Sequence, residues 1–289
     1  MTTTPATVPF EPLAPGPGDR SRLSWALADT AVVAKRNLLR YVRVPSLLVF
    51  TFVQPIMFTL LFRYVFGGAI PLPGNIPYVN YLLPGIFVQT VLFGSTATGV
   101  GLAEDMSAGL VDRFRSLPMA RMAVLAGRTL ADLVRNFVVV VLMAAVGFLV
   151  GFRPHGGVGG FLAAVAIVLA VAFAFSWIFA IVGLGSPTAE AAQAVSFPLI
   201  FPLTFASSAF VPTSGMPGPL RAFADNQPIT LVINAVRRLM LGGVDSAPLH
   251  RAGLLPGSTA TAALQAVVWI GAILVVAAPL AVARFRRTV

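Results

Sequence analysis

The sequence predicts an all-α integral membrane protein with six transmembrane helices, and three observations support this prediction. Of 289 residues, 57% are apolar and 10% are charged, whereas an ordinary soluble domain has about 25% charged residues. Six apolar stretches are long enough to cross a bilayer, which takes roughly 20 helical residues. The cations gather in links that would share one side of the membrane. This composition excludes a water-soluble globule and also a disordered chain, which needs few apolar residues and many charges.

The chain divides into a tail, a surface helix and a membrane domain. Residues 1–23 are expected to form a disordered cytoplasmic tail, because the first 19 contain five prolines. They also lack the basic start and apolar centre of a signal peptide. Residues 24–44 form the surface helix, and residues 45–289 hold the six spans.

Residues 24–44 are too charged to span but are amphipathic. One stripe is apolar and consists of Leu27, Ala31, Ala34, Leu38 and Tyr41. The opposite face is basic and carries Arg36, Arg40 and Arg43. This pattern is typical of an interfacial helix, with its apolar face in the acyl chains and its basic face toward anionic headgroups. The alternative is a plain basic segment beside the membrane.

The six predicted spans contain no Asp or Glu. They are residues 46–66, 79–103, 133–152, 161–183, 193–211 and 262–283. A proton-coupled carrier usually needs an acid inside the membrane, so acid-free spans disfavour that class.

The distribution of Lys and Arg predicts the orientation. The segment before the first span, the link between the second and third spans, and the C-terminus carry six, five and three cations, 14 in all, against 6 on the other side. Cytoplasmic links are the basic ones, so both termini are expected in the cytoplasm, in a bacterial inner membrane. This asymmetry accounts for the net charge of +10 without a nucleic-acid partner.

Two links have structure of their own. Residues 104–117 are amphipathic, which fits either a docking element for a cytoplasmic partner or the second span continuing into water.

After the fifth span, Asn226-Gln227-Pro228 is typical of a helix start. The next helix has an apolar face and should end at Gly242-Gly243. At about 13 residues it is too short to cross, so we expect re-entrant or surface-lying outer helices.

Several chemistries have no sequence support. There is no phosphate-binding glycine loop, so we expect no nucleotide hydrolysis by this chain. There is no Cys, and His155 and His250 stand alone in links, so no metal site is expected. A six-span protein without an energy source of its own is best explained as one subunit of a larger machine.

Three motifs resemble those of a known family. They are the run from Glu104 to Pro118, the run Glu190-Ala191-Ala192-Gln193, and an outer link with Pro212, Asn226, Pro228 and Arg237. In this order they resemble the type-2 ABC transporter permeases, and in particular the daunorubicin-resistance drug-export branch. The likeness covers about residues 25–289.

The resemblance implies a division of labour. A separate ATPase subunit would bind ATP and Mg, with no cofactor in this chain. A second permease chain would complete the pathway, as a homodimer or with a sister permease. A cytoplasmic coupling helix would dock on the ATPase through Glu104, Gly109, Asp112, Arg113, Phe114, Arg115, Leu117 and Pro118. Glu190 would make a second cytoplasmic contact. The pathway lining would include Phe197, Phe201, Phe205 and Phe210, whose alternative role is packing against lipid or helices.

The predicted function is therefore that of a non-catalytic permease subunit of an ATP-driven exporter. Its cargo would be a hydrophobic or amphipathic compound such as a drug, antibiotic or lipid. The alternative within the family is export of a polysaccharide or lipid-linked glycan. The sequence favours both over a secondary carrier or a membrane scaffold.

Overall fold

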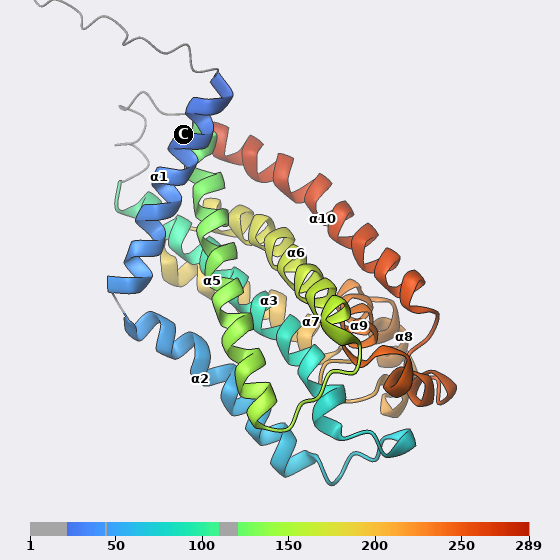
Figure 1. Ribbon diagram of the computed structural model, residues 1–289. Coiled ribbons are helices and arrows are strands. Elements are labelled where there is room, and N and C mark those ends of the chain that lie inside the picture. The colour runs from blue at the N-terminus through green and yellow to red at the C-terminus, as the bar shows by residue number, and fades with distance from the viewer. Residues whose placement is uncertain (1–21, 44, 110–120, 289) are drawn as a thin grey trace, which may run out of the picture.

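The computed structural model describes residues 22–43, 45–109 and 121–288, and all the regular structure in these residues is helical (Figure 1). The elements in order are α1 (Arg22–Arg43), α2 (Pro45–Leu61), a π-helical turn η1 (Phe62–Phe66), a 3-10 turn η2 (Pro73–Asn75), α3 (Tyr78–Ser107), α5 (Arg121–Leu149), α6 (Gly157–Leu184), α7 (Ala189–Phe205), a 3-10 turn η3 (Thr213–Gly215), α8 (Gly218–Asn226), α9 (Pro228–Arg251) and α10 (Thr259–Thr288).

Four of these helices, α3, α5, α6 and α10, are long and apolar enough to cross a membrane. They coincide with the second, third, fourth and sixth predicted spans. The first predicted span matches α2 and η1, and the fifth matches α7, which has only 17 residues. The all-helical class with several membrane helices is confirmed, and these two shorter helices are too short to establish six crossings by length alone.

The helices run between two ends of the bundle. The start of α1, the end of α3, the start of α5 and the end of α10 lie at one end, which we call the terminal end (Figure 1). The α2–α3 connection, the α5–α6 connection and α8 lie toward the opposite, distal end. Both described chain ends therefore share one end of the bundle.

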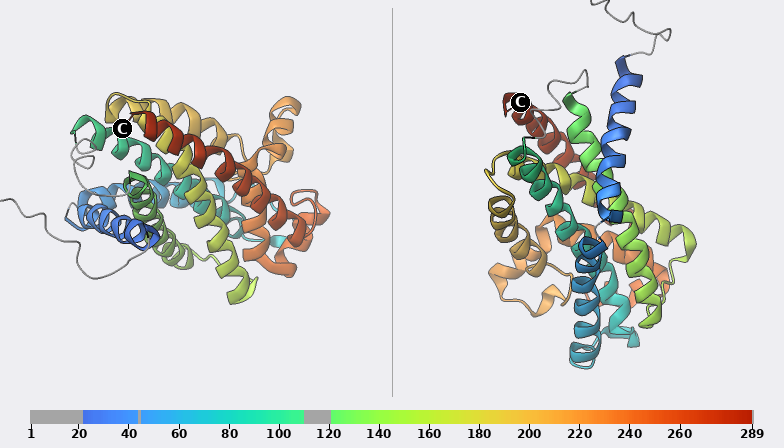
Figure 2. Two further views of the ribbon diagram at one scale, coloured as in Figure 1. Left: turned by 90° about the horizontal axis from the view of Figure 1, so that it is seen from above. Right: turned by 90° about the vertical axis from the view of Figure 1, so that its left-hand side faces the viewer.

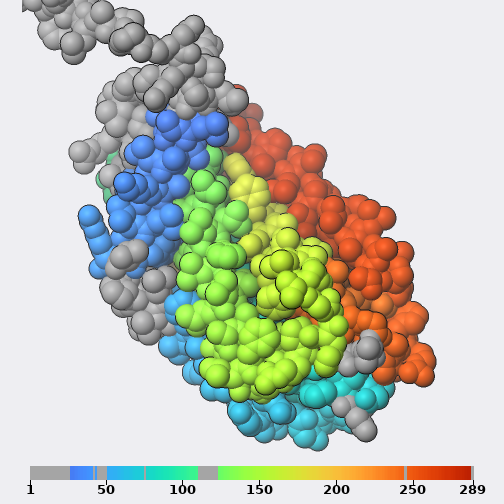
Figure 3. All heavy atoms as spheres, in the orientation of Figure 1, coloured from blue at the N-terminus to red at the C-terminus, as the bar shows by residue number. Residues whose placement is uncertain are grey.

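Helix α3 is the centre of the bundle and packs against α5, α6, α7 and α9. Its contact with α6 is especially close, because a Cβ atom on Gly99 would lie 2.4 Å from the carbonyl oxygen of Phe179. Small residues let two membrane helices approach until their backbones touch. Helices α5, α6 and α10 lie side by side across one face (Figure 3). The exposed valines of α10, such as Val267 and Val275, suit contact with lipid.

Helix α1 is present as predicted, within two residues at its start and one at its end. Its axis slants across those of α6 and α10 (Figures 1 and 2). It packs against α5 and buries Val33, Ala34 and Asn37. Leu27, on the predicted apolar stripe, is exposed. Protein covers part of the face that the sequence assigned to acyl chains.

The fifth predicted span ends earlier than expected. Helix α7 stops at Phe205, so residues 206–211 are not helical and Phe210 lies in the following turn. The last regular helical hydrogen bond runs from the Ala206 N–H to the Pro202 carbonyl at 2.9 Å. Beyond it, the Ser207 hydroxyl donates to the Thr204 carbonyl at 2.5 Å.

The outer link agrees with its predicted pattern. The predicted apolar face of α9, from Ile229 to Met240, is buried in the bundle. Gly242 breaks the helix with φ 66° and ψ −171°, where the sequence expected an end. The chain then resumes a helix up to Arg251, which the sequence did not predict.

Two helices extend beyond the predicted spans and include acidic residues. Helix α3 runs on to Ser107 and α5 begins at Arg121. Glu104, Asp105 and Asp132 therefore lie on the two long apolar helices, outside the shorter spans that hydropathy had marked.

Candidate functional site

The predicted coupling helix begins as the last turn of α3. Glu104 to Ser107 are helical in continuation with the span, so the described part fits the alternative of a second span that extends beyond the membrane. The helix ends where Gly109 adopts a φ of +66° and its N–H bonds to the Met106 carbonyl at 3.0 Å. Glycine at a helix end takes this left-handed conformation without strain. The docking residues Asp112, Arg113, Phe114, Arg115, Leu117 and Pro118 lie outside the described residues, and their roles stay a prediction.

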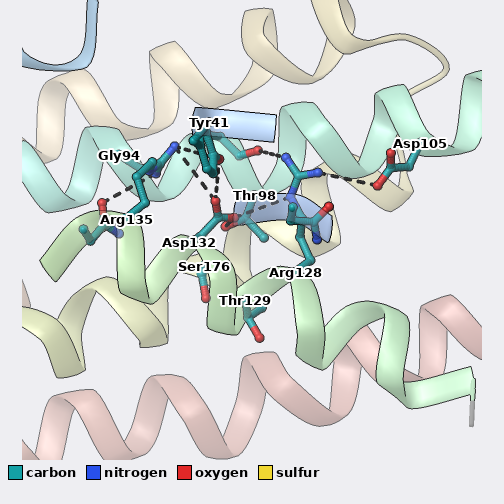
Figure 4. Close-up of polar contacts among 12 residues, drawn as sticks. Tyr41, Gly94, Thr98, Asp105, Arg128, Thr129, Asp132, Arg135 and Ser176 are labelled. Carbon is teal, nitrogen blue, oxygen red and sulfur yellow. Dashed lines mark hydrogen bonds and ion pairs between the residues drawn. The ribbon is translucent and has the colours of Figure 1, made fainter. Parts of the chain in front are cut away.

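A buried charged cluster lies beside this turn, between α1, α3 and α5 (Figure 4). We call it the terminal-end cluster; it consists of Tyr41, Thr98, Asp105, Arg128, Asp132 and Arg135. Arg128 lies between two carboxylates, 3.5 Å from Asp105 and 3.6 Å from Asp132. Arg135 lies 3.9 Å from the other oxygen of Asp132.

Asp132 is the centre of this cluster and is 1% exposed. Its carboxylate accepts hydrogen bonds from the Thr98 hydroxyl at 2.6 Å and the Tyr41 hydroxyl at 2.9 Å. Tyr41 in turn accepts from Arg135 at 3.2 Å. A buried carboxylate is stable only when it is both paired and hydrogen-bonded. These contacts supply both, and they join three helices through one side chain.

Helix α1 is tied to the end of α3 by two further ion pairs. Arg36 lies 3.2 Å from Asp105, and Arg40 lies 2.6 Å from Glu104. The hydrogen bond from Arg40 to Glu104 raises the pKa of the Arg40 guanidinium, which stays charged. The sequence had assigned Arg36, Arg40 and Arg43 to lipid headgroups. The structure gives two of them protein partners, while Arg43 is exposed.

This cluster was not predicted from the sequence, although a signal for it was present. Arg128, Asp132 and Arg135 stand at i, i+4 and i+7, which places them on one face of a helix. Hydropathy started the third span at residue 133, and so all but one of these residues were assigned to the water-exposed link.

The predicted pathway phenylalanines form a continuous stack. Phe197, Phe201 and Phe205 follow one face of α7, with ring centroids 6.2 and 4.2 Å apart. Phe210 continues the series 5.2 Å beyond Phe205. It also stacks on Phe62 of η1 at 4.4 Å. Phe197 and Phe201 are 47% and 45% exposed. The stack thus has one packed end and one end open at the surface of this chain.

The second predicted cytoplasmic contact, Glu190, is exposed in the first turn of α7. Hydrogen bonds from its own backbone N–H and from the Thr188 side chain lower the pKa of its carboxyl. Thr188 also caps the helix by accepting from the Ala191 N–H at 3.2 Å.

At the distal end, Arg237 of the outer link motif is fully buried. It donates to the backbone carbonyls of Tyr81 at 3.0 Å and Ser208 at 2.7 Å, and to the Asn234 amide oxygen at 3.2 Å. Its guanidinium also stacks 3.7 Å from the centroid of the Tyr81 ring. We call this set the distal cluster. The same motif places Pro212 ahead of η3, Asn226 at the end of α8 and Pro228 at the start of α9.

No group of three or more potential metal ligands occurs in the part of the chain that the structure describes. His250 has its Nδ1 2.8 Å from the Leu255 carbonyl oxygen. The candidate sites are therefore the terminal-end cluster, the phenylalanine stack and the distal cluster.

Comparison with known proteins gives a family and named relatives. A model of the family described as ABC-2 type transporter matches residues 29–241. The chain is 34% identical over 249 residues to the daunorubicin resistance ABC transporter permease protein DrrB1 of Streptomyces coeruleorubidus, covering 84% of this chain and 88% of that one. It is 27% identical over 233 residues to the probable doxorubicin resistance ABC transporter permease protein DrrC of Mycobacterium tuberculosis, covering 81% and 84%. It is also 27% identical, over 74% of each chain, to the putative transport permease ycf38 of Cyanophora paradoxa.

Proposed function

The chain belongs to the ABC-2 type transporter family, and from that premise we propose that it is the membrane subunit of an ATP-driven exporter for a hydrophobic or amphipathic compound. Such a compound would be a drug, an antibiotic or a lipid. The observation that carries this proposal is the 34% identity to a permease named for daunorubicin resistance, because the match covers most of both chains.

We propose six crossings with both termini in the cytoplasm. Two features support this: α2 with η1 and α7 run between the same two ends as the four longer helices, and the described chain ends share the terminal end (Figure 1). The 14 cations that the sequence places on that side favour a cytoplasmic terminal end. Helices α8 and α9 would then form the re-entrant outer link.

A separate ATPase subunit that binds ATP and Mg would supply the energy for transport, and this chain would be non-catalytic. The end of α3 and residues 110–120 would dock on that subunit, with Glu190 as a second contact. The terminal-end cluster supports a mechanical role, because a displacement of the α3 tip would act directly on α1 and α5 through Asp105 and Asp132. A second permease chain would cover the exposed Phe197 and Phe201 and complete the pathway.

Co-purification tests the docking part of the proposal. The double variant Arg113→Glu with Phe114→Ala should lose the partner ATPase, because it reverses a charge and removes an apolar anchor. Its membrane insertion should be unchanged. The matched control is Arg221→Glu with Phe223→Ala, since both of these side chains are exposed on α8 at the distal end. Retention of the ATPase by the first variant, or its loss from the control, would contradict the docking site.

Transport tests the function itself. Inverted vesicles that contain this chain and its ATPase should accumulate doxorubicin or the uncharged dye quinizarin when ATP is added, as measured by fluorescence. Vesicles with the Arg113→Glu, Phe114→Ala variant should not. If wild-type vesicles accumulate neither reporter, the proposed function is wrong.

A further inference from the structure

A groove of about 370 Å³ lies between α6 and α10, which pack side by side (Figure 1). We call it the α6–α10 groove. Its walls are formed by Ile178 and Ile181 of α6 and by Trp269, Ile273, Val276 and Leu280 of α10. Every described side chain that lines it is apolar, and both helices are long and apolar enough to cross a membrane. The groove therefore lies at the depth of the lipid hydrocarbon.

The groove faces outward from the bundle. Trp269, Val276 and Leu280 are 40%, 59% and 55% exposed. On the inner side, Ala277 lines the groove and belongs to a buried cluster with Trp177 of α6. Protein thus closes the floor of the groove, and its open side meets the surrounding lipid.

The length of the groove matches the hydrocarbon layer of one leaflet. At 1.5 Å per residue, α10 rises about 16 Å from Trp269 to Leu280. Half of the hydrocarbon core of a bilayer is about 15 Å thick. A single acyl chain that runs along α10 therefore fills the groove from the bilayer centre to the level of the headgroups.

Two arginines extend the line of the groove toward the terminal end. Arg284 and Arg287 follow Leu280 by four and seven residues, which places them on the same face of α10. Both are exposed, and they lie about 6 and 10 Å beyond Leu280 along the helix axis. Since the headgroup layer on each side of a bilayer is roughly 5–8 Å thick, these side chains are at the level of the lipid phosphates.

The charge at this end of the groove is positive only. No Asp or Glu follows Asp245 in the sequence, so α10 carries no carboxylate that neutralises its arginines. Arg284 also reaches the end of α6, because a Cβ atom on Gly185 would lie 2.5 Å from the Arg284 Nη2 atom. A third arginine, Arg286, is exposed but lies about 100° around the helix from Arg287, away from the groove. The apolar groove thus ends in two cations that match an anionic headgroup.

We propose that the α6–α10 groove binds an anionic phospholipid, with one acyl chain along α10 and the phosphate against Arg284 and Arg287. A zwitterionic phospholipid offers the same chain, but its own cation competes with the arginines for the phosphate. Each basic residue at this level raises the affinity for an anionic headgroup about fivefold. The lipid is a bound component of the membrane subunit and not its cargo, so this inference goes beyond the proposed function.

Quenching of Trp269 fluorescence by brominated lipid tests the inference, because bromine quenches tryptophan only at close range. The full chain is placed in phosphatidylcholine nanodiscs with increasing fractions of phosphatidylglycerol or phosphatidylcholine brominated near the methyl end of the acyl chain. Trp269→Phe gives the background from the other two tryptophans. Brominated phosphatidylglycerol should quench Trp269 at mole fractions roughly 10- to 25-fold lower than brominated phosphatidylcholine, as two arginines predict.

Two neighbouring arginines provide a matched pair of variants. Arg287→Gln should weaken phosphatidylglycerol binding about fivefold relative to phosphatidylcholine. Arg286→Gln removes the same charge from the same turn of α10, but on a face away from the groove, and should leave the preference nearly unchanged. Equal losses from the two variants would mean that the arginines attract anionic lipid diffusely, and would overturn the proposal.

Two neighbouring valines provide a second pair, which tests the position of the acyl chain. Val276→Phe narrows the groove and should shift the phosphatidylglycerol curve to higher mole fractions. Val275→Phe should not, since Val275 is exposed but does not line the groove. All four variants replace exposed side chains, so they should unfold near the wild-type temperature.

Three results in this assay contradict an anionic lipid in the groove. Brominated phosphatidylglycerol and phosphatidylcholine could quench Trp269 alike, which would remove the headgroup preference. Val275→Phe could act like Val276→Phe, which would place the acyl chain elsewhere. If neither lipid quenches Trp269, a helix of another chain covers the groove and the proposal is wrong.

Discussion

Each end of the molecule buries arginine, but the two ends neutralise it differently. At the terminal end, Arg128 and Arg135 face carboxylates on α3 and α5 at 3.5 to 3.9 Å. At the distal end, Arg237 is held by carbonyl and amide oxygens at 2.7 to 3.2 Å and by the ring of Tyr81. The first arrangement combines opposite charges with hydrogen bonds, such as those from Arg128 to the Ala97 carbonyl at 3.1 Å and from Arg135 to the Tyr41 hydroxyl at 3.2 Å. The second uses neutral acceptors.

This difference indicates which end can move. The attraction between two charges falls slowly with distance, so an ion pair of nearly 4 Å survives a small shift of its helices. A hydrogen bond weakens steeply when its distance or angle changes. The ion pairs of the terminal-end cluster therefore persist through a small shift that would break its hydrogen bonds, whereas the described contacts of Arg237 are all with neutral groups. That contrast matches a machine driven from the side where the ATPase is proposed to dock.

Removal of the Asp132 carboxylate should have the largest effect on stability and transport. Asp132→Asn leaves Arg128 and Arg135 without their shared counter-charge, which typically costs about 3–5 kcal/mol for a buried pair. We expect a large fall in the midpoint of thermal unfolding in detergent. Because the cluster joins α1, α3 and α5, any folded fraction should also lose ATP-driven transport.

The control for this change is Asp225→Asn, which removes an exposed carboxylate that pairs with one arginine four residues away. It should alter stability little, because exposed ion pairs contribute about 0–1 kcal/mol. If Asp132→Asn lowers the unfolding midpoint no more than Asp225→Asn does, the terminal-end cluster does not hold α1, α3 and α5 together.

The distal cluster should respond in stability alone. Arg237→Met keeps the volume but removes the Arg237 donors to the Tyr81 and Ser208 carbonyls and to the Asn234 amide oxygen. The Ser208 carbonyl keeps the Tyr81 hydroxyl at 3.4 Å and the Asn234 oxygen keeps the Ser208 hydroxyl at 3.2 Å, so we expect a cost of about 1–3 kcal/mol in all. The unfolding midpoint should fall, while transport per folded molecule should stay near the wild-type rate. Arg221→Met on the exposed side of α8 is the matched control. A transport defect in folded Arg237→Met would show that the distal end moves too.

Local patterns in the sequence were sufficient to predict some features. The apolar face of α9 and the break at Gly242 follow from helical spacing and from glycine, and both are confirmed. The positions of the long helices follow from hydropathy, because a long apolar run is stable inside the membrane, where its backbone must form a helix.

The sequence could not predict which charged residues, distant along the chain, neutralise one another in the fold. Hydropathy places a charged residue in water, so Arg128 and Asp132 were assigned to a link. In the fold they cancel each other and lie in the bundle. The partners of Arg36 and Arg40 are 69 and 64 residues away, respectively, and no periodicity connects them. The docking residues beyond Gly109 stay a prediction from family resemblance.

The smallest expected effect lies where the terminal end meets water. Arg40 and Glu104 are each 44% exposed and 2.6 Å apart. A double-mutant cycle of Arg40→Ala and Glu104→Ala should give a coupling free energy of about 0.2–1 kcal/mol that shrinks in high salt, because solvent screens exposed pairs. The cycle with Arg36→Ala and Asp105→Asn should give a larger and less salt-sensitive value, since Asp105 is buried and shares Arg128. Equal coupling free energies in both cycles would mean that burial does not strengthen the Arg36–Asp105 pair. The terminal-end cluster would then hold the helices together no better than the exposed Arg40–Glu104 pair does.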